Sequence, residues 1–272
     1  MYISYNGTIK KEKDFTLLLN NRGFAYGDGL FETILFIKEP LYFEEHISRL
    51  CDGLTLLSIS YDRNELTSFI QEKIHLLIQK NGLDVARIKV TAFRNSDGFY
   101  APSISSKEVS ILIECKEIQQ LPSYIKKEVC FSSEVQNHSS TIANFKTLSS
   151  INYVLAGIEM NKKSADDIII LSEKGFISEC LYSSIYWIKD QQVYTPPLST
   201  GCIRGILRTS LLANLSIKEY EITKEDILKA DAIFSSNVLG VYAIEKIGET
   251  TFNSSSHPIV QALQTKYNLL SL

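Results

Sequence analysis

The sequence of 272 residues predicts an α+β protein with two domains. The first half combines strand patterns with two helical stretches, and the second half is dominated by short strand patterns. Between the halves, the apolar periodicity lapses around Pro122. We therefore expect a small N-terminal α+β domain at 1–118, a linker at 119–128 and a larger C-terminal domain at 129–272.

In the first half, turn residues and side-chain periodicity mark each expected element. Asn6-Gly7 is a hairpin turn, and residues 21–29, rich in glycine and aromatic residues, are expected to form a loop. Apolar residues recur at helical spacing over residues 66–78, and Asn81-Gly82 ends that helix. The other expected elements are strands at 31–37, 86–94 and 109–115 and a helix at 44–57.

In the second half, short strands alternate with turn residues. Lys174-Gly175 and Lys189-Asp190 mark two turns. Thr223 and Asp226 resemble a capping pair at the start of a short helix, and Pro258 is a suitable first residue for the last helix. The remaining expected elements are a strand near Val129, strands at 167–171, 176–180, 184–188, 232–236 and 241–247, and helices at 204–215 and 259–270.

Composition and charge argue against several classes of protein. The formal net charge is −3, which gives no electrostatic reason to expect nucleic acid or an anionic membrane as a partner. The cysteines are odd in number and lack CxxC spacing, and the histidines lack ligand spacing, so we expect neither a disulfide scaffold nor a metal site. No apolar stretch approaches the ~20 residues needed to span a bilayer, and the N-terminus does not have the pattern of a signal peptide. We therefore expect a soluble, cytoplasmic protein.

Lys146 is the first candidate for chemistry. It lies in Ile-Ala-Asn-Phe-Lys-Thr-Leu, residues 142–148. A lysine among apolar neighbours loses hydration, which disfavours its charged form, and a neutral amine can attack an aldehyde to form a Schiff base. The alternative is a lysine whose stem is buried while its ammonium reaches the surface. For a single lysine considered alone, this alternative has the greater weight.

Three further segments contain groups suited to a phosphorylated cofactor. Gly201 and Gly205 precede an expected helix start, where free N–H groups can bind phosphate, although an ordinary loop-to-helix turn has the same pattern. Arg49, on an expected helix, has a guanidinium that matches phosphate or simply faces solvent. Glu179, late in an expected strand, can pair with a protonated ring nitrogen or point outward. Each pattern is weak alone, and their order along the chain makes them informative.

Taken together, these segments resemble the class IV aminotransferases, the fold-type IV pyridoxal-phosphate (PLP) enzymes. Residues 21–33, Asn-Arg-Gly-Phe-Ala-Tyr-Gly-Asp-Gly-Leu-Phe-Glu-Thr, are similar to the opening signature of that family. Residues 195–208 are similar to its phosphate loop and the following helix, and residues 231–237 resemble a late strand that also reaches the phosphate. The segments that resemble its phosphate-binding arginine, its Schiff-base lysine and its glutamate strand are 46–50, Lys146 and 175–187. The resemblance covers nearly the whole chain, in the order of the family.

The resemblance implies a fold, a cofactor and a set of site residues. The fold is a small N-terminal α+β domain and a larger C-terminal domain with a barrel-like β-sheet, with PLP in the cleft between them, in a homodimer whose partner subunit helps to wall the site. Lys146 would form the Schiff base and move the substrate proton, and Glu179 would keep the pyridine nitrogen protonated. The groups implied to anchor the phosphate are Arg49, the Gly205 turn, the backbone of Ile206 and Leu207, and Ser236.

Two positions depart from the family pattern. Ser184 stands where the family usually has an asparagine. Many members also have a tyrosine four or five residues beyond the lysine, which bonds the ring hydroxyl of PLP. This chain has Ser150 and Ile151 at those positions, and its nearest tyrosine is Tyr153.

Three functions follow from the resemblance. The first is transfer of an amino group between an amino acid and a 2-oxo acid, with Arg94 and Tyr100 as candidates for binding the substrate. The second is a 4-amino-4-deoxychorismate lyase, which forms p-aminobenzoate and pyruvate for folate synthesis. Thr33, in the Phe-Glu-Thr triplet, is suited to helping a proton move in such an enzyme. The third, motivated by the two departures, is a PLP-binding protein without catalytic activity.

Overall fold

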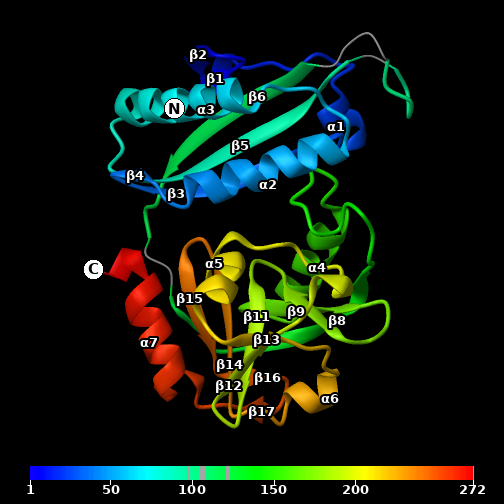
Figure 1. Ribbon diagram of the computed structural model, residues 1–272, viewed down its shortest axis with the longest axis vertical. Coiled ribbons are helices and arrows are strands. Elements are labelled where there is room, and N and C mark those ends of the chain that lie inside the picture. Colours follow the sequence, from blue (N-terminus) through cyan, green and yellow to red (C-terminus); the bar gives the residue numbers. More distant parts are fainter. Residues whose placement is uncertain (97, 104–107, 121–122, 272) are drawn as a thin grey trace. The chain divides into compact units, whose positions relative to one another are not determined.

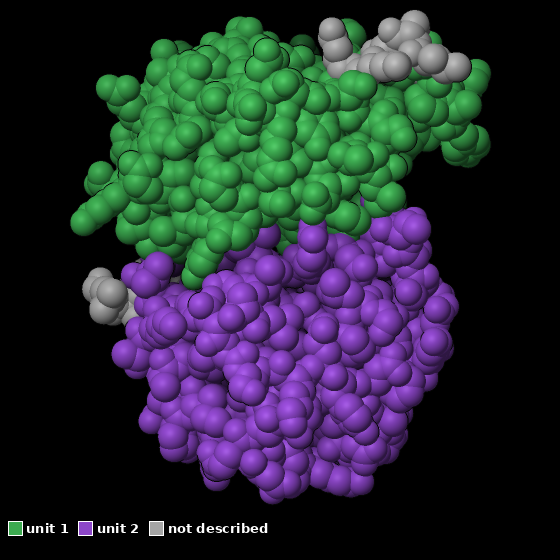
Figure 2. Space-filling view, viewed as in Figure 1, with its two compact units in different colours: residues 1–120, 145–150 green, residues 121–144, 151–272 purple. Residues whose placement is uncertain are grey.

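The chain divides into two compact units in a computed structural model, which describes residues 1–96, 98–103, 108–120 and 123–271. Unit 1 comprises residues 1–120 and 145–150, and unit 2 comprises residues 121–144 and 151–272 (Figure 2). The first boundary falls within the predicted linker, whose Pro122 lies outside the described residues. The segment 145–150, which carries Lys146, belongs to unit 1 although it follows that linker in sequence.

Unit 1 is built on one six-stranded sheet, in the order β2-β1-β6-β5-β3-β4 (Figure 1). One cluster of buried side chains joins alternate residues of β3, β5 and β6 to both long helices, α2 and α3, so both helices cover the same face of the sheet. The strands are β1 (Tyr2–Tyr5), β2 (Thr8–Lys11), β3 (Gly29–Ile37), β4 (Glu39–Pro40), β5 (Val85–Asn95) and β6 (Glu108–Glu117). The helices are α1 (Arg22–Tyr26), α2 (Phe43–Leu56) and α3 (Arg63–Asn81), with a 3-10 turn at Glu12–Asp14.

The turns and caps of unit 1 follow from residues that the sequence singles out. Asn6 and Gly7 both have positive φ, 46° and 84°, as a tight hairpin requires. The helix expected to end at Asn81-Gly82 does so, with Gly82 in the left-handed region. The loop expected at 21–29 is wrong in part, because Asn21 caps the short helix α1 by accepting a hydrogen bond from the backbone N–H of Phe24 at 2.8 Å.

Unit 2 contains two sheets, β10-β9-β8-β16-β17 and β13-β12-β11-β14-β15-β7. The strands are β7 (Ile125–Lys126), β8 (Val129–Asn137), β9 (Asp167–Ser172), β10 (Ile177–Cys180), β11 (Ser184–Lys189), β12 (Gln192–Thr195), β13 (Ile217–Glu219), β14 (Ala232–Asn237), β15 (Gly240–Ile244), β16 (Lys246–Ile247) and β17 (Thr250–Thr251). The helices are α4 (Ile151–Lys162), α5 (Ile206–Asn214), α6 (Lys224–Ile227) and α7 (Pro258–Tyr267), and 3-10 turns lie at Leu198–Thr200, Ser254–Ser256 and Leu269–Ser271.

The two sheets of unit 2 continue into each other and enclose one core. The chain passes from β7 directly to β8 and from β15 directly to β16, and a bridge between Cys180 and Ser183 links β10 to β11. Residues from both sheets, such as Ile169, Ile185 and Ile233, belong to a single buried cluster. This arrangement agrees with the barrel-like sheet that the resemblance implies.

Helix α4 is the main element that the sequence pattern did not predict. Its large apolar residues Ile151, Val154 and Ile158 are exposed, by 64%, 53% and 46%, whereas few of its residues are buried. A helix with apolar residues on its exposed side lacks the one-sided periodicity that marks a surface helix in a sequence. The strand expected at 241–247 is also two short strands, β15 and β16, which belong to different sheets.

Candidate functional site

Lys146 is held at the edge of the unit 1 sheet by backbone pairing with β3. The N–H of Phe31 donates to the carbonyl of Lys146 at 2.9 Å, the N–H of Leu148 donates to the carbonyl of Gly29 at 3.0 Å, and Thr147 pairs with Leu30. Side chains alternate along such an extended segment. Phe145 packs into the core beneath the helices, so Lys146 projects from the opposite face of the sheet.

On that face Lys146 meets residues of β3 and β5. Its Nζ lies 4.5 Å from the centre of the Phe31 ring, and the Nζ of Lys89 lies 5.4 Å from the same ring. Lys89 is the cross-strand partner of Thr33, and Thr33 and Phe31 are on the same side of β3. Phe31, Thr33 and Lys89 thus lie on the face of the sheet from which Lys146 projects, and Lys89 is a second amine that the sequence did not single out.

Gly27 makes room for the segment that carries Lys146. It has φ of 64°, in the left-handed region, and a Cβ at this position would lie 3.0 Å from the backbone nitrogen of Ser149. Both features favour glycine. The glycine-rich segment 21–29 thus has a structural purpose, because it lets residues 145–150 approach β3 closely.

Arg49 lies on α2 and binds a carboxylate inside unit 1. Its Nε donates to Oε1 of Glu32 at 2.8 Å and its Nη2 donates to Oε2 at 2.6 Å, while Nδ1 of His46 lies 2.6 Å from the same Oε2. Burial raises the pKa of Glu32, but the charge of Arg49 and the hydrogen bonds from His46 and Arg49 lower it to about 2. Glu32 belongs to the helix-covered face of β3, so Arg49 does not share a face with Thr33 and Lys146.

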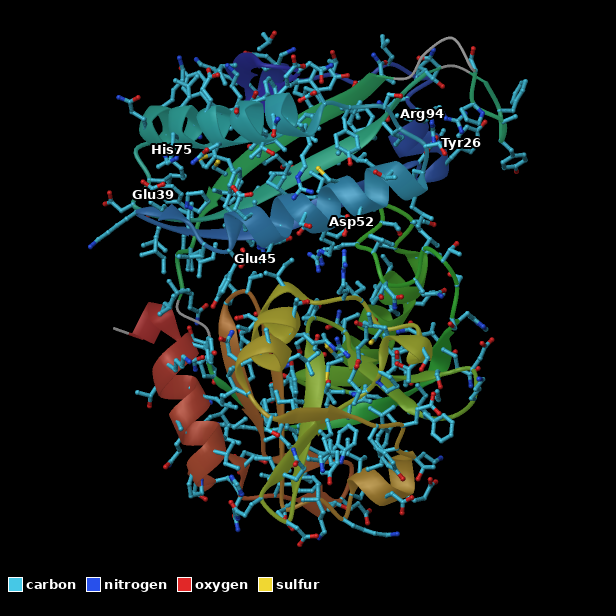
Figure 3. All side chains as sticks on the ribbon, in the orientation of Figure 1. Tyr26, Glu39, Glu45, Asp52, His75 and Arg94 are labelled. Atoms are coloured by element: carbon cyan, nitrogen blue, oxygen red, sulfur yellow. The ribbon has the colours of Figure 1, made fainter. Side chains whose placement is uncertain are left out.

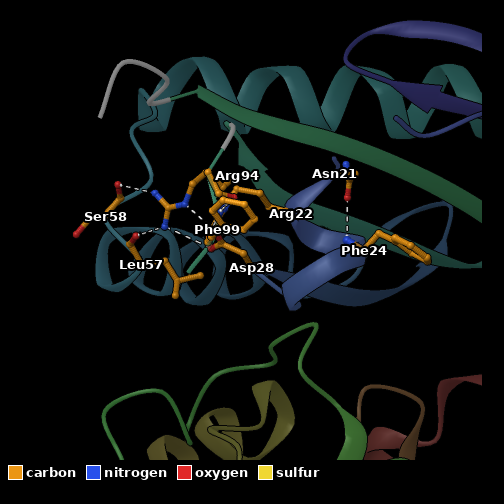
Figure 4. Close-up of polar contacts among 9 residues, drawn as sticks. Asn21, Arg22, Phe24, Asp28, Leu57, Ser58, Arg94 and Phe99 are labelled. Atoms are coloured by element: carbon orange, nitrogen blue, oxygen red, sulfur yellow. Dashed lines mark hydrogen bonds and ion pairs between the residues drawn. The ribbon is translucent and has the colours of Figure 1, made fainter. Parts of the chain in front are cut away.

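Arg94, a predicted substrate residue, is bound within unit 1. Its Nε and Nη2 donate to the carboxylate of Asp28 at 2.8 and 3.3 Å, and Nη2 also donates to the carbonyl of Leu57 at 2.6 Å (Figure 4). Arg22 donates to the same carboxylate at 2.7 Å. Burial raises the pKa of Asp28, but the hydrogen bonds from Arg94 and Arg22 hold it below its ordinary value. This cluster fixes the end of the sheet near α1.

Tyr100, the other predicted substrate residue, lies on the surface of unit 1. Its side chain is 90% exposed, and its ring centre is 5.6 Å from that of Tyr26. Arg94 and Tyr26 both lie at the α1 end of the unit (Figure 3). The substrate roles of Arg94 and Tyr100 stay predictions.

In unit 2, Glu179 accepts hydrogen bonds from three donors. Oε1 accepts from Nδ2 of Asn137 and from the hydroxyl of Tyr153, both at 2.8 Å, and Oε2 accepts from the backbone N–H of Ile203 at 3.1 Å. Glu179 is only 4% exposed. Each of these hydrogen bonds favours the charged form of the carboxylate, which is the form that can pair with a protonated ring nitrogen.

The start of helix α5 has the features of a phosphate site. No side chain caps its N-terminus at Gly205, although the first N–H groups of a helix have no partner within the helix. A Cβ at Gly205 would lie 2.8 Å from Oγ of Ser184. The glycine therefore permits a close approach between the helix start and the hydroxyl of Ser184, the residue that departs from the family pattern.

A second pair of hydroxyls lies in the same sheet. Oγ of Ser236 is 2.9 Å from the hydroxyl of Tyr186, and Ser236 is the cross-strand partner of Ser184. Burial raises the pKa of Tyr186 to about 12, so the phenol stays protonated. Ser184, Ser236 and Tyr186 give unit 2 a cluster of neutral donors. The sequence pointed to Ser236 and, as a departure from the family pattern, to Ser184, but not to Tyr186.

These groups fit the cofactor that the resemblance implies. Unit 2 supplies a hydrogen-bonded carboxylate, at Glu179, together with a helix start at Gly205 that no side chain caps, close to the hydroxyl of Ser184. The loop that leads to Gly205 is bound to Glu179 through Ile203. Such a donor set suits a molecule with a protonated ring nitrogen and a phosphate.

Within the described residues, no three histidine, cysteine or acidic side chains gather as a metal site would require. In the same part of the chain, no helix combines the length and apolar character needed to cross a bilayer. The five cysteines are all free thiols.

Comparison with known proteins gives consistent results. The family model for amino-transferase class IV matches residues 29–247. The chain is 29% identical to an aminodeoxychorismate lyase of Bacillus subtilis, over 97% of this chain and 93% of that protein. It superposes on the branched-chain amino acid aminotransferase of Escherichia coli with a TM-score of 0.86 and 21% identity, covering 97% and 92% of the two chains. For another branched-chain amino acid aminotransferase, solved with pyridoxamine 5'-phosphate, the TM-score is 0.85 at 18% identity, with 98% and 92% covered. The predicted fold class is confirmed.

Proposed function

Because the chain belongs to the class IV aminotransferase family, a family of PLP enzymes, we propose that it is a PLP-dependent enzyme in which Lys146 bonds to the cofactor. The observation that carries the proposal is the position of Lys146. Its amine lies on the same face of unit 1 as Thr33, held there by the pairing of residues 146–148 with β3.

The other proposed roles follow from the donor sets of each unit. PLP, when bound, withdraws electrons from the substrate carbon that bears the amino group. Glu179, kept ionised by its donors, would hold a proton on the ring nitrogen. The N–H groups of Ile206 and Leu207, with Ser236 and the Gly205 turn, would bind the phosphate. For Arg49, whose guanidinium binds Glu32 within unit 1, a role at the phosphate rests on the family resemblance alone.

For the reaction itself, we favour lysis of 4-amino-4-deoxychorismate into p-aminobenzoate and pyruvate. The C4 hydrogen leaves as a proton, the bond from C3 to the ether oxygen breaks, and the methylene carbon of the departing fragment gains a proton to become the methyl group of pyruvate. The proton must therefore travel from the ring to the departing fragment. Lys146 can take it, and the hydroxyl of Thr33 is suited to passing it on.

Two further observations support the lyase. The substrate carries two carboxylates, and the ammonium of Lys89, which is opposite Thr33, offers a positive charge for one of them. The relative of Bacillus subtilis named an aminodeoxychorismate lyase agrees with this choice.

The test measures both reactions on one preparation. The purified protein, loaded with PLP, is given 4-amino-4-deoxychorismate while pyruvate and p-aminobenzoate are measured, and separately given amino acids with 2-oxo acids while amino transfer is measured. We expect the two lyase products in equal amounts. Amino transfer without lysis would replace the lyase with an aminotransferase, and the absence of both would favour a PLP-binding protein without activity.

Lys146→Ala tests the nucleophile in the same preparation. We expect the visible absorbance of the bound cofactor to be lost and both products to disappear, because no other residue is proposed to bond to the aldehyde. Lys162→Ala, which changes a lysine on the exposed side of α4, is the matched control. Visible absorbance that persists in Lys146→Ala would remove Lys146 from the proposal.

A further inference from the structure

Tyr153 shares Oε1 of Glu179 with a second side chain. It lies in the first turn of α4 and donates its hydroxyl hydrogen to that oxygen at 2.8 Å. Nδ2 of Asn137 donates to the same oxygen at 2.8 Å. The tyrosine is seven residues beyond Lys146, not four or five, and its partner is the carboxylate proposed for the ring nitrogen.

The phenol of Tyr153 is a donor under all conditions in which an enzyme works. Burial raises its pKa well above the ordinary value, and the charge of Glu179 raises it further. Glu179 has no hydrogen to donate when ionised, so the phenol is the donor in this bond. The direction of the hydrogen bond is thereby fixed.

A fixed donor on Glu179 affects where a proton rests between the carboxylate and a ring nitrogen. Hydrogen bonds to the charged form of a carboxylate lower its affinity for a proton. A proton shared between Glu179 and a ring nitrogen therefore stays on the nitrogen, which is the state that withdraws electrons from the substrate. If Glu179 lost one of these donors, its affinity for the shared proton would rise, and the ring nitrogen would be protonated less of the time.

We propose that Tyr153 is a positioning residue for Glu179, so that in this chain a tyrosine supports the carboxylate proposed for the ring nitrogen of the cofactor. The hydroxyl orients the carboxylate and favours its charged form. The inference rests on the proposed function, because it assigns Glu179 to the cofactor.

The experiment compares the wild type with Tyr153→Phe, which removes the hydroxyl and keeps the ring. Both proteins are loaded with PLP labelled with 15N at the ring nitrogen, and the 15N chemical shift and the Kd of PLP are measured. We expect the signal of the variant to move toward that of the unprotonated ring, since Glu179 loses a donor that favours its charged form. We expect the Kd to rise roughly tenfold, since the carboxylate is no longer held in position before PLP binds. Tyr182→Phe, at a side chain 61% exposed, is expected to change neither value.

A second background separates an effect through Glu179 from a general loss of packing. In Glu179→Gln there is no carboxylate to compete with the ring nitrogen for a proton. Adding Tyr153→Phe to this variant is therefore expected to leave the 15N shift unchanged. Thermal unfolding of the PLP-free proteins shows that the variants are folded. A 15N shift that Tyr153→Phe moves equally with and without Glu179 would overturn the inference.

The outcomes also separate this inference from the proposed function. A wild-type protein that does not bind PLP through Lys146 would overturn the proposed function, and the inference with it. A wild-type protein that binds PLP through Lys146, together with a Tyr153→Phe protein of unchanged 15N shift and Kd, would overturn only the role of Tyr153.

Discussion

Arg49 donates two hydrogen bonds to the carboxylate of Glu32, from Nε to Oε1 at 2.8 Å and from Nη2 to Oε2 at 2.6 Å. Both side chains are buried. Two parallel hydrogen bonds of this kind fix the orientation of a guanidinium more firmly than a single contact. The pair joins α2 to β3 beside the core of unit 1. It therefore links the stability of that unit to the position of the arginine proposed for phosphate binding.

Glu32→Gln is expected to destabilise the protein by about 3–5 kcal/mol at pH 7, because it leaves the buried charge of Arg49 without its carboxylate. The pKa of Glu32 is lowered from 4.5 to about 2 in the folded protein. A lowered pKa stabilises the folded state above about pH 4.5, and that contribution is lost as pH falls toward 2. Urea unfolding of the wild type and the variant at pH 7 and pH 3 measures both effects.

The matched control for Glu32 is Glu45→Gln, at an exposed position of α2 (Figure 3). It is expected to change the free energy of unfolding by less than about 0.5 kcal/mol. The stability difference between the wild type and Glu32→Gln should be smaller at pH 3 than at pH 7. An equal difference at both values would show that ionisation of Glu32 does not contribute.

Arg49→Ala is expected to weaken PLP binding at least tenfold, since it removes a positive charge proposed for the phosphate and the partner that orders Glu32. The Kd of PLP, followed by its absorbance, measures the effect. Arg49→Lys keeps the charge without the two-pronged geometry and should lie between the wild type and Arg49→Ala. An unchanged Kd in Arg49→Ala would remove this residue from the phosphate site.

Gly205→Ala is expected to cost about 1 kcal/mol of stability and to weaken PLP binding, because the new Cβ forces Oγ of Ser184 to move from a position 2.8 Å away. Combining it with Ser184→Ala should restore the stability, since the crowded oxygen is then absent. Gly157→Ala, whose Cβ meets nothing nearer than 3.6 Å, is the control and should not lower the stability, since alanine is the better helix former. Equal losses with and without Ser184 would show that the close approach is unimportant.

Thr33→Val is expected to lower the rate of pyruvate release about a hundredfold while the Kd of PLP stays the same, because it removes a proton-carrying hydroxyl and keeps the shape. Thr33→Ser should retain much of the rate. Steady-state kinetics with 4-amino-4-deoxychorismate measure both variants. A Thr33→Val protein with the rate of the wild type would leave Lys146 as the sole proton carrier.

Most elements of the fold were predictable from local patterns. The hairpin at Asn6-Gly7, the helix ending at Asn81-Gly82 and the Thr223 cap, which accepts a hydrogen bond from the N–H of Asp226, all depend on residues a few positions apart. Helix α4 was missed because its apolar residues face outward, and α1 was missed because five residues give too short a pattern.

The sequence by itself determined the family. It also determined the order of the segments that carry candidate site residues, from residues 21–33 to Lys146, Glu179 and Gly205. Only the tertiary structure decided which partners these residues have. The strand register places Lys89 opposite Thr33. Tertiary packing pairs Arg94 with Asp28, 66 positions apart, and Tyr153 with Glu179, 26 positions apart. Such contacts depend on how whole strands and helices pair and pack, and no local spacing of residues specifies that arrangement.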